Sequence, residues 1–329
     1  MSQTTAPWSK AATRGGAFRR KQSEFRDRIS DDGSTPFPAE AGRYHLYVSL
    51  ACPWAHRTLV HRALLGLEDA VSVDVVDWHM QDDGSWRFDP SVPGATEDSQ
   101  RGADSLQEVY RAADPDFPGI GTVPVLWDKA QGTIVNNESR DIIRMFNAVL
   151  APGLGVPRDR TLLPAGLEAE VDAMIDANYE SVNNGVYKCG FARTQEAYDA
   201  AWPPLFDRLD ELDAHLEGRD WLCGEGPDGR GVLTEADVCL WVTLLRFDPV
   251  YHTHFKCNRK LIQQYPDLHA FVRRLHRVPG VAGTVDMDHI RGHYYWSHEG
   301  LNPHRIVPAG PDLEAWLGVD PSPTRRTRS

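Results

Sequence analysis

The sequence predicts an α/β domain followed by an all-helical domain. Strand-like and helix-like segments alternate between residues 44 and 150, and the apolar residues after position 165 recur with a helical period. A segment rich in Pro and Gly, 151–164, separates the two patterns and is interpreted as a linker. The chain has 329 residues, more than a single hydrophobic core usually holds, which also favours two domains.

The two ends of the chain lack a sustained hydrophobic period. Residues 1–43 are rich in Gly, Arg, Asp, Ser and Pro, and we interpret them as an irregular arm that packs over the body. Composition alone leaves disorder open as an alternative for this arm. Residues 322–329 are predicted to form a disordered tail.

Residues 44–150 predict an α/β domain whose first strand, 44–50, is short, apolar and aromatic. The expected elements that follow are a helix at 54–66, a strand at 71–76, a long connection at 79–118, strands at 122–128 and 133–136, and a helix at 139–149. The first three form a β-α-β unit. The complete order, β-α-β-β-β-α with a proline opening the third strand, is the thioredoxin-like arrangement.

Residues 165–321 predict the all-helical domain. Helical stretches are expected at about 166–184, 195–217, 235–247 and 267–277, with a mixed region near 285. The third stretch begins with Thr234 followed three residues later by Asp237, a capping pattern for a helix N-terminus.

Charge and cysteine usage exclude several classes of protein. The net charge of −12 argues against nucleic acid or an anionic membrane as the main partner. The five cysteines are widely spaced and odd in number, which favours reduced thiols and a cytoplasmic location. The N-terminus has no apolar signal region, and no apolar run approaches the roughly 18 residues that a membrane-spanning helix needs.

Cys52 is the leading candidate for a catalytic nucleophile. It lies between a predicted strand and a predicted helix, directly before Pro53, a residue favoured in the first helical turn. Free backbone N–H groups and the helix dipole there stabilise a thiolate, which predicts a lowered pKa for Cys52. Because Ala55 stands where a second cysteine would be, an external thiol must complete any exchange. The alternative is a buried structural cysteine.

Two further segments predict a pocket for a small zwitterionic thiol beside Cys52. In thioredoxin-like folds the proline at the position of Pro124 is cis, which exposes the N–H and C=O groups of Val123 to a peptide-like ligand. Ser139 opens a predicted helix whose N-terminus can hold a carboxylate, and Glu138 can bind an ammonium group. An ordinary helix cap is the alternative for this second segment.

At these residues the sequence resembles the glutathionyl-hydroquinone reductases, or Xi-class glutathione transferases, over nearly its whole length. The resemblance is carried by GGAFRR at 15–20, GRYHLYVSLACPWAHRT at 42–58, VPVLWD at 123–128, IVNNES at 134–139, NGVYKCGFA at 184–192, RFDPVY at 246–251, DHIR at 288–291 and HYY at 293–295. It implies the glutathione transferase fold and a homodimer.

The resemblance also implies a two-step exchange with glutathione as co-substrate. Cys52 would attack the sulfur of a glutathionyl-hydroquinone, and a second thiol would resolve the mixed disulfide. The residues implied to bind glutathione are Trp86, Thr122, Val123, Pro124, Glu138 and Ser139. Tyr187 would act as the acid/base residue, while Tyr251 and Tyr294 would line the acceptor pocket and favour the thiolate.

One departure from the family pattern leaves the identity of the thiol open. The family usually carries Gly-Arg-Val-Thr-Val-Pro, but the arginine is replaced here by Ile120. If that arginine supports a glutathione carboxylate, this chain would bind glutathione more weakly or prefer another small thiol such as mycothiol. An omega-like thiol transferase or dehydroascorbate reductase is a second candidate function, and a non-catalytic interaction module is a third.

Other candidate sites are weaker. His252, His254 and Cys257 have metal-compatible spacing but lack an evident further ligand, so no metal site is predicted. The arginine pair Arg57 and Arg62 and the cluster at 273–277 are interpreted as solvated helix faces.

Overall fold

The N-terminal half contains a four-stranded mixed sheet. The computed structural model describes residues 15–318. The strands are β1 (Tyr44–Val48), β2 (Val71–Val75), β3 (Val125–Asp128) and β4 (Thr133–Asn136), in the order β2-β1-β3-β4. Strand β1 is parallel to β2 and antiparallel to β3, which is antiparallel to β4. This confirms the predicted thioredoxin-like arrangement.

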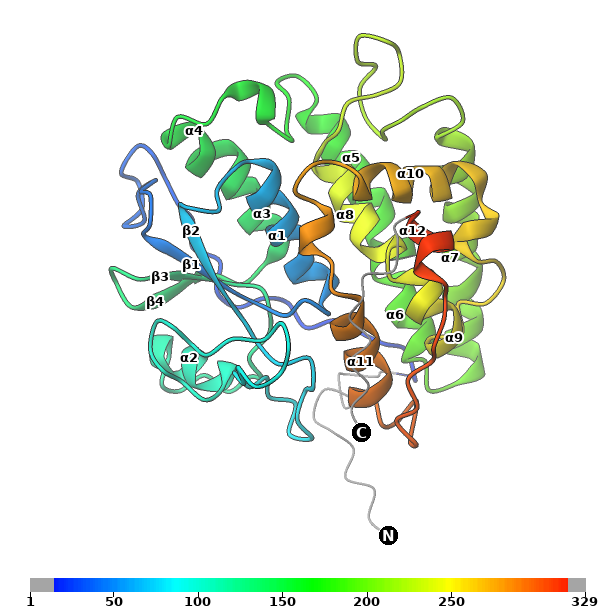
Figure 1. Ribbon diagram of the computed structural model, residues 1–329, viewed down its shortest axis with the longest axis horizontal. Helices are drawn as coiled ribbons and strands as arrows, with labels where there is room; N and C mark the ends of the chain where they lie inside the picture. Colours follow the sequence, from blue (N-terminus) through cyan, green and yellow to red (C-terminus); the bar gives the residue numbers. More distant parts are fainter. Residues whose placement is uncertain (1–14, 319–329) are drawn as a thin grey trace.

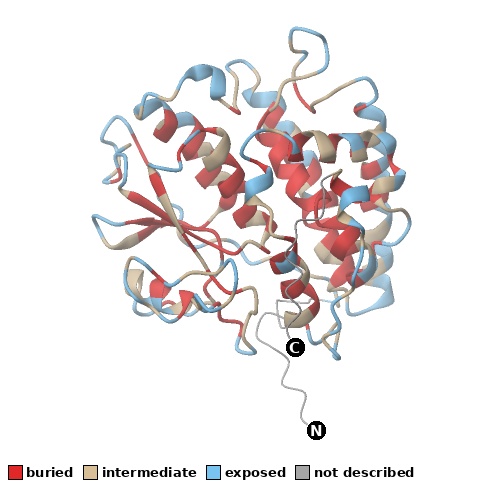
Figure 2. Cartoon of the chain, in the orientation of Figure 1, coloured by how far each residue is buried: buried red, intermediate tan, exposed pale blue. Residues whose placement is uncertain are grey.

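Helices cover both faces of this sheet, so its central strands are buried (Figures 1 and 2). Helices α1 (Pro53–Leu64) and α3 (Ser139–Met145) lie on one side, and α2 (Leu106–Ala113) lies on the other. All five residues of β1 are buried, as expected for a strand that is paired on both edges. Helix α2 lies within the predicted connection 79–118, where the sequence analysis did not identify it.

The C-terminal half is helical. Its longer helices are α5 (Glu168–Asn178), α6 (Gly185–Gly190), α7 (Gln195–His215), α8 (Glu235–Leu244), α10 (Pro266–His276) and α11 (Met287–Ser297). Three short helices complete the set, α4 (Ala151–Gly153), α9 (His252–His254) and α12 (Leu313–Leu317), with π-helical turns at Phe146–Leu150, Tyr179–Asn183 and Phe247–Tyr251. The four predicted helical stretches are present, whereas α6 and α11 were not identified from the sequence.

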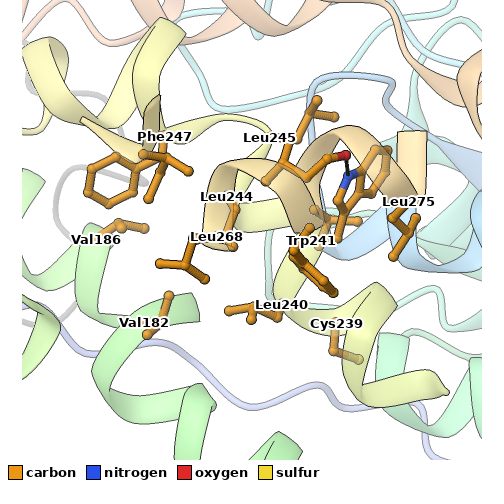
Figure 3. Close-up of a cluster of buried hydrophobic side chains, with 14 of the residues drawn as sticks. Val182, Val186, Cys239, Leu240, Trp241, Leu244, Leu245, Phe247, Leu268 and Leu275 are labelled. Atoms are coloured by element: carbon orange, nitrogen blue, oxygen red, sulfur yellow. Dashed lines mark hydrogen bonds between the residues drawn. The ribbon is translucent and has the colours of Figure 1, made fainter. Parts of the chain in front are cut away.

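Helix α8 lies at the centre of the helical half. All ten of its residues are buried, and Leu240, Trp241 and Leu244 pack among side chains of the surrounding helices (Figure 3). A helix that is buried around its whole circumference is typical of a protein interior. The predicted cap is confirmed, because the Asp237 carboxylate accepts hydrogen bonds from the Thr234 N–H (2.7 Å) and hydroxyl (2.9 Å).

The arm spans both halves of the molecule along residues 15–43. Arg193 in the helical half donates its N–H to the Gly16 carbonyl (3.0 Å), and Asn137 after β4 donates to the Phe25 carbonyl (3.1 Å). Ile29 is buried against the sheet cluster. The described part of the arm therefore packs over the body, while residues 1–14 and the predicted tail 322–329 lie outside the described residues.

Within residues 15–318, none of the helices combines the length and the apolarity needed to cross a bilayer.

Candidate active site

Cys52 occupies the N-cap of α1, at the end of the loop that leaves β1. Its backbone is extended (φ −77°, ψ 122°), and Pro53 takes the first helical position. The Cys52 carbonyl accepts the His56 N–H (3.0 Å), the first hydrogen bond of the helix. The local sequence thus places the sulfur at the positive end of a helix, as predicted.

Opposing influences act on the Cys52 thiol. Burial is the largest and raises the pKa of Cys52, while the Ala55 and Trp54 N–H groups and the cations Arg246 and Arg20 lower it. The net result is a raised pKa. The predicted lowering of the pKa of Cys52 is therefore wrong, because burial outweighs the helix N-terminus.

The segment before β3 brings its backbone to Cys52. The Val123–Pro124 peptide bond is cis, and the Cys52 Sγ lies 3.7 Å from the Val123 carbonyl oxygen. Helix α2 supports this segment, since the Tyr110 hydroxyl donates to the Thr122 carbonyl (2.8 Å). Gln107 of the same helix accepts the Gly121 N–H (2.9 Å). Helix α2, which was not predicted from the sequence, therefore supports this wall of the site.

A cavity of about 480 Å³ lies where the arm, α1, α3 and α5 meet. Five of the six residues predicted to bind the thiol line it: Thr122, Val123, Pro124, Glu138 and Ser139. The arm contributes Arg20, Lys21, Gln22, Ser23 and Arg26. The arm is therefore part of the cavity wall, which the sequence analysis did not anticipate.

Glu138 and Ser139 are held at the start of α3 on one side of this cavity. Glu138 is the N-cap and accepts the Arg140 N–H (3.3 Å). The Ser23 hydroxyl of the arm donates to the other carboxylate oxygen (3.0 Å). This carboxylate therefore has polar neutral partners and is oriented by both the helix and the arm.

Three tyrosine hydroxyls form a hydrogen-bonded row. Tyr294 of α11 lies in the middle, 2.6 Å from the Tyr187 hydroxyl of α6 and 3.0 Å from the Tyr251 hydroxyl. Burial raises the pKa of all three, so the row is protonated near neutral pH. Tyr187 is partly exposed, whereas Tyr251 and Tyr294 are buried. Tyr187 is thus the member of the row that solvent reaches, although it is not among the residues that line the cavity.

Trp86 does not line the cavity. It is buried in the loop before α2 and packs on His293 of α11, with ring centroids 4.8 Å apart. Its carbonyl accepts the Leu106 N–H (2.9 Å) at the start of α2. This tryptophan connects the α2 loop to the helical half.

Two arginines that line the cavity were not predicted as site residues. Arg57 is 2% exposed, so its interpretation as part of a solvated helix face is wrong. Its guanidinium carbon lies 4.4 Å from the Trp54 ring centroid, and that of Arg20 lies 4.5 Å from the same ring. The spacing of Trp54 and Arg57, three residues apart on one helix, is the sequence signal that could have revealed the pair.

Arg246, which follows the end of α8, holds the loop that carries Cys52. Its side chain is fully buried and donates to the carbonyls of Leu50 (3.0 Å) and Ala51 (2.8 Å). It also lies 3.1 Å from the His56 Nδ1. Burial holds the pKa of His56 well below its usual value, so this histidine is neutral and accepts the hydrogen bond.

Among residues 15–318, no group of three or more His, Cys, Asp or Glu side chains is arranged to hold a metal ion.

Comparisons with known proteins give a consistent family assignment. Family models match residues 51–149 (Glutathione S-transferase, N-terminal domain) and residues 195–274 (Glutathione S-transferase, C-terminal domain). Glutathionyl-hydroquinone reductase YqjG of Escherichia coli (strain K12) is 47% identical over 321 residues, 95% of each chain.

Two solved structures support the same assignment. The glutathione-S-transferase Xi from Phanerochaete chrysosporium has a TM-score of 0.84 and 51% identity, and the match covers 90% of this chain and 93% of that one. The glutathione-bound structure of YqjG from Escherichia coli K-12 has a TM-score of 0.82 and 47% identity, covering 89% and 94% of the two chains.

Proposed function

The chain belongs to the glutathione S-transferase family, in the group of Xi-class transferases and glutathionyl-hydroquinone reductases, and from this premise we propose that it reduces glutathionyl-hydroquinones with glutathione. The observation that carries the proposal is Cys52 at a helix N-cap, 3.7 Å from the carbonyl of Val123, a residue that lines a cavity with Glu138 and Ser139. A nucleophilic sulfur beside a pocket for a zwitterionic peptide is the arrangement that thiol exchange requires.

The proposed reaction has two exchange steps. In the first, the Cys52 thiolate attacks the sulfur of the adduct, a Cys52–glutathione disulfide forms, and the bonding electron pair of the broken carbon–sulfur bond goes to the aromatic carbon. That carbon takes up a proton and the hydroquinone leaves. In the second step a glutathione thiolate attacks the disulfide, which releases oxidised glutathione and returns Cys52 as a thiolate.

The row of tyrosines supports the proton transfer. Tyr187 is the partly exposed end of the row, and its hydroxyl shares a hydrogen bond of 2.6 Å with the Tyr294 hydroxyl. We assign Tyr187 the role of proton donor to the aromatic carbon, with Tyr294 and Tyr251 stabilising the phenolate that this transfer leaves.

The binding roles follow the cavity wall. Val123 would pair with the peptide backbone of glutathione, Glu138 would bind its ammonium group, and Ser139 a carboxylate. Thr122 and Pro124 complete that wall. We retain Trp86 as a residue that reaches glutathione only if the α2 loop moves when the ligand binds.

A cytoplasmic location and a homodimer are also part of the proposal. All five cysteines are free, which fits a reducing compartment. The homodimer is proposed from the family alone, and size-exclusion chromatography with light scattering tests it.

The test of the proposed function is reduction of glutathionyl-menadione by the wild type and by Cys52→Ala, with glutathione and then mycothiol as donor. We expect turnover with glutathione that falls to background in Cys52→Ala. Cys223→Ala is the matched control, since Cys223 is buried and does not line the cavity.

Other outcomes separate the alternatives. Clearly faster turnover with mycothiol would identify mycothiol, rather than glutathione, as the co-substrate. The replacement of the family arginine by Ile120 favours this alternative. Activity on dehydroascorbate without activity on quinone adducts would indicate the omega-like reductase. Folded protein without turnover on either substrate, with either thiol, would contradict an enzymatic role.

A further inference from the structure

The cavity beside Cys52 contains hydrogen-bond donors that the protein itself does not satisfy. Eleven buried side-chain atoms within residues 15–318 have no hydrogen-bond partner, and three of them belong to residues that line this cavity: Arg20 Nη2, Trp54 Nε1 and Arg57 Nε. All three residues line the same cavity, and both guanidinium groups stack on the Trp54 ring. Buried polar groups in folded proteins are nearly always paired, so three unpaired donors around one cavity indicate a missing acceptor.

The charges around the cavity also indicate that a negatively charged acceptor is missing. Three of the five cations that line it have carboxylate partners: Arg26 pairs with Asp141, Arg140 with Asp172 and Asp176, and Lys21 with Glu24. Arg20 and Arg57 form no ion pair with a carboxylate within the described part of the chain, although both line the cavity.

Neutral groups take up the remaining contacts of these two arginines. Arg20 Nε donates to the Asn184 side-chain oxygen (3.3 Å). Arg57 donates to the Ser139 hydroxyl (3.5 Å) and to the Cys239 carbonyl (3.4 Å). These contacts are long, and none brings a negative charge. Because Arg57 is 2% exposed, its cost of burial is not offset by solvent.

We propose that Arg20, Trp54 and Arg57 form an anion subsite that binds a carboxylate of the thiol co-substrate. The proposal rests on the proposed function and adds a recognition site to it. A carboxylate is the acceptor that fits, because its two oxygens can accept several N–H donors and its charge balances a guanidinium. Glu138, on the same cavity wall, makes the cavity suited to a zwitterion rather than to a simple polyanion.

The subsite also gives a role to the arm. Arg20 is carried by the arm and lies between two rings, 4.5 Å from the Trp54 centroid and 4.8 Å from that of Tyr187. The arm thus brings a cation to the boundary between the thiol cavity and the tyrosine row. Because the other cations that line the cavity are already paired with carboxylates, these two arginines are the positive charges available to a ligand carboxylate.

The test measures binding of S-methylglutathione, an unreactive thioether, to the full-length chain by calorimetry. We expect Arg20→Gln and Arg57→Gln each to weaken binding by about tenfold to a hundredfold, the range for charged hydrogen bonds. Arg19→Gln is the matched control, since Arg19 is an exposed neighbour on the arm. Arg57→Lys keeps the charge without the planar guanidinium, and we expect binding between that of the wild type and of Arg57→Gln.

Two analogues distinguish the two carboxylates of glutathione. One carries an ethyl ester on the glycine carboxylate, and the other has hydrogen in place of the α-carboxylate. For each arginine we expect the effect of the Gln substitution to vanish with one analogue, the one that lacks the carboxylate in contact, and to persist with the other.

The outcomes that overturn the subsite differ from those that overturn the function. Equal binding by wild type, Arg20→Gln and Arg57→Gln, with normal turnover of the wild type, would reject the subsite alone. An effect that persists with both analogues would reject the carboxylate as occupant. A wild type that neither binds S-methylglutathione nor turns over the adduct would reject the proposed function. Circular dichroism checks that the variants are folded. Arg20→Gln changes a residue of the arm rather than of the core, so we expect it to fold like the wild type.

Discussion

A single thiol, Cys52, is subject to influences of opposite sign. The helix N-terminus and two cations stabilise its thiolate, whereas burial favours the neutral thiol and is the largest influence. A raised pKa does not exclude nucleophilic chemistry, because the thiolate that is present is more nucleophilic when its pKa is higher.

The first prediction concerns the pH dependence of Cys52 alkylation. Since the pKa of Cys52 is raised above that of an ordinary thiol, the thiolate fraction is small at neutral pH and grows as pH rises. We expect the rate of reaction with iodoacetamide to increase continuously from pH 7 to pH 9. Cys52→Ala measures the background from the four buried cysteines. A rate that reaches its plateau below pH 7 would show that the helix N-terminus outweighs burial.

The second prediction separates the three tyrosines. Tyr187→Phe removes the partly exposed hydroxyl, and we expect kcat for the quinone adduct to fall by about a hundredfold, the scale of general acid catalysis. Tyr251→Phe removes the hydroxyl at the far, buried end of the row, and we expect a smaller fall. Both variants should retain the thermal midpoint of the wild type within a few degrees. Equal losses of kcat in the two variants would contradict the assignment of Tyr187 as the donor.

At the scale of single residues, the sequence predicts well where a residue lies in the order of strands and helices, and it predicts poorly which side chains surround that residue. The position of Cys52 follows from a strand, a proline and a helix that are adjacent in the chain. The burial of Arg57 depends instead on Trp54, Ser139 and the Cys239 carbonyl, which only the folded chain brings together. Its prediction as a solvated residue failed for that reason.

Among the secondary-structure elements, α8 shows how a local signal is reinforced by the tertiary structure. Thr234 and Asp237 form the predicted cap, but the Asp237 carboxylate also accepts the Leu222 N–H (2.8 Å) from a distant loop. Burial raises the pKa of Asp237 to about 7. The cap therefore links the start of α8 to the loop after α7 and makes it sensitive to pH.

The third prediction follows from this raised pKa. Between the ordinary carboxyl pKa of about 3.8 and about 7, the folded chain holds a proton on Asp237 that the unfolded chain has lost. The contribution of Asp237 to the free energy of unfolding is therefore fully present at low pH and is lost as pH rises through 7. Relative to Asp237→Asn, which does not titrate, we expect the wild type to lose about 3 kcal/mol between pH 5 and pH 8. Urea denaturation of both proteins at the two pH values measures it, and a constant difference between them would refute the shift.

Two of the helices that were not predicted, α6 and α11, were missed for a similar physical reason. Helix α6 is six residues long and has glycine at both ends, and α11 contains Gly292, so neither has a strong helical pattern. Packing favours glycine at position 292, because a Cβ there would lie 3.0 Å from the Trp78 ring, which would have to shift. These two helices carry Tyr187 and Tyr294, so part of the site lies on elements shaped by tertiary contacts.

Across the whole molecule, the site is assembled by contacts between the two halves. The sheet half supplies Cys52 and the cavity wall, the helical half supplies the tyrosines, and the arm touches both (Figure 1). Arg246 is a direct link, because it extends from the end of α8 to the carbonyls of Leu50 and Ala51 in the loop before Cys52. The order of the elements could be predicted from the sequence, whereas these long-range links could not.

The fourth prediction tests that link. Arg246→Met would leave the carbonyls of Leu50 and Ala51 without their donors, and one or two unsatisfied buried groups cost about 3 kcal/mol or more of unfolding free energy. Arg230→Met is the control, because Arg230 is about half exposed and pairs with Asp220 at the surface, where an ion pair adds little to the free energy of unfolding.

The same substitution should act on Cys52 as well as on stability, since the positive charge of Arg246 lowers the pKa of that thiol. We expect Arg246→Met to slow alkylation of Cys52 at pH 8 and Arg246→Lys, which keeps the charge, to slow it less. Urea midpoints and alkylation rates of the two variants measure the two effects separately. Lower stability with an unchanged alkylation rate would show that Arg246 is only a structural link. Lower stability together with slower alkylation would show that this buried cation joins the two halves and also lowers the pKa of the nucleophile at their boundary.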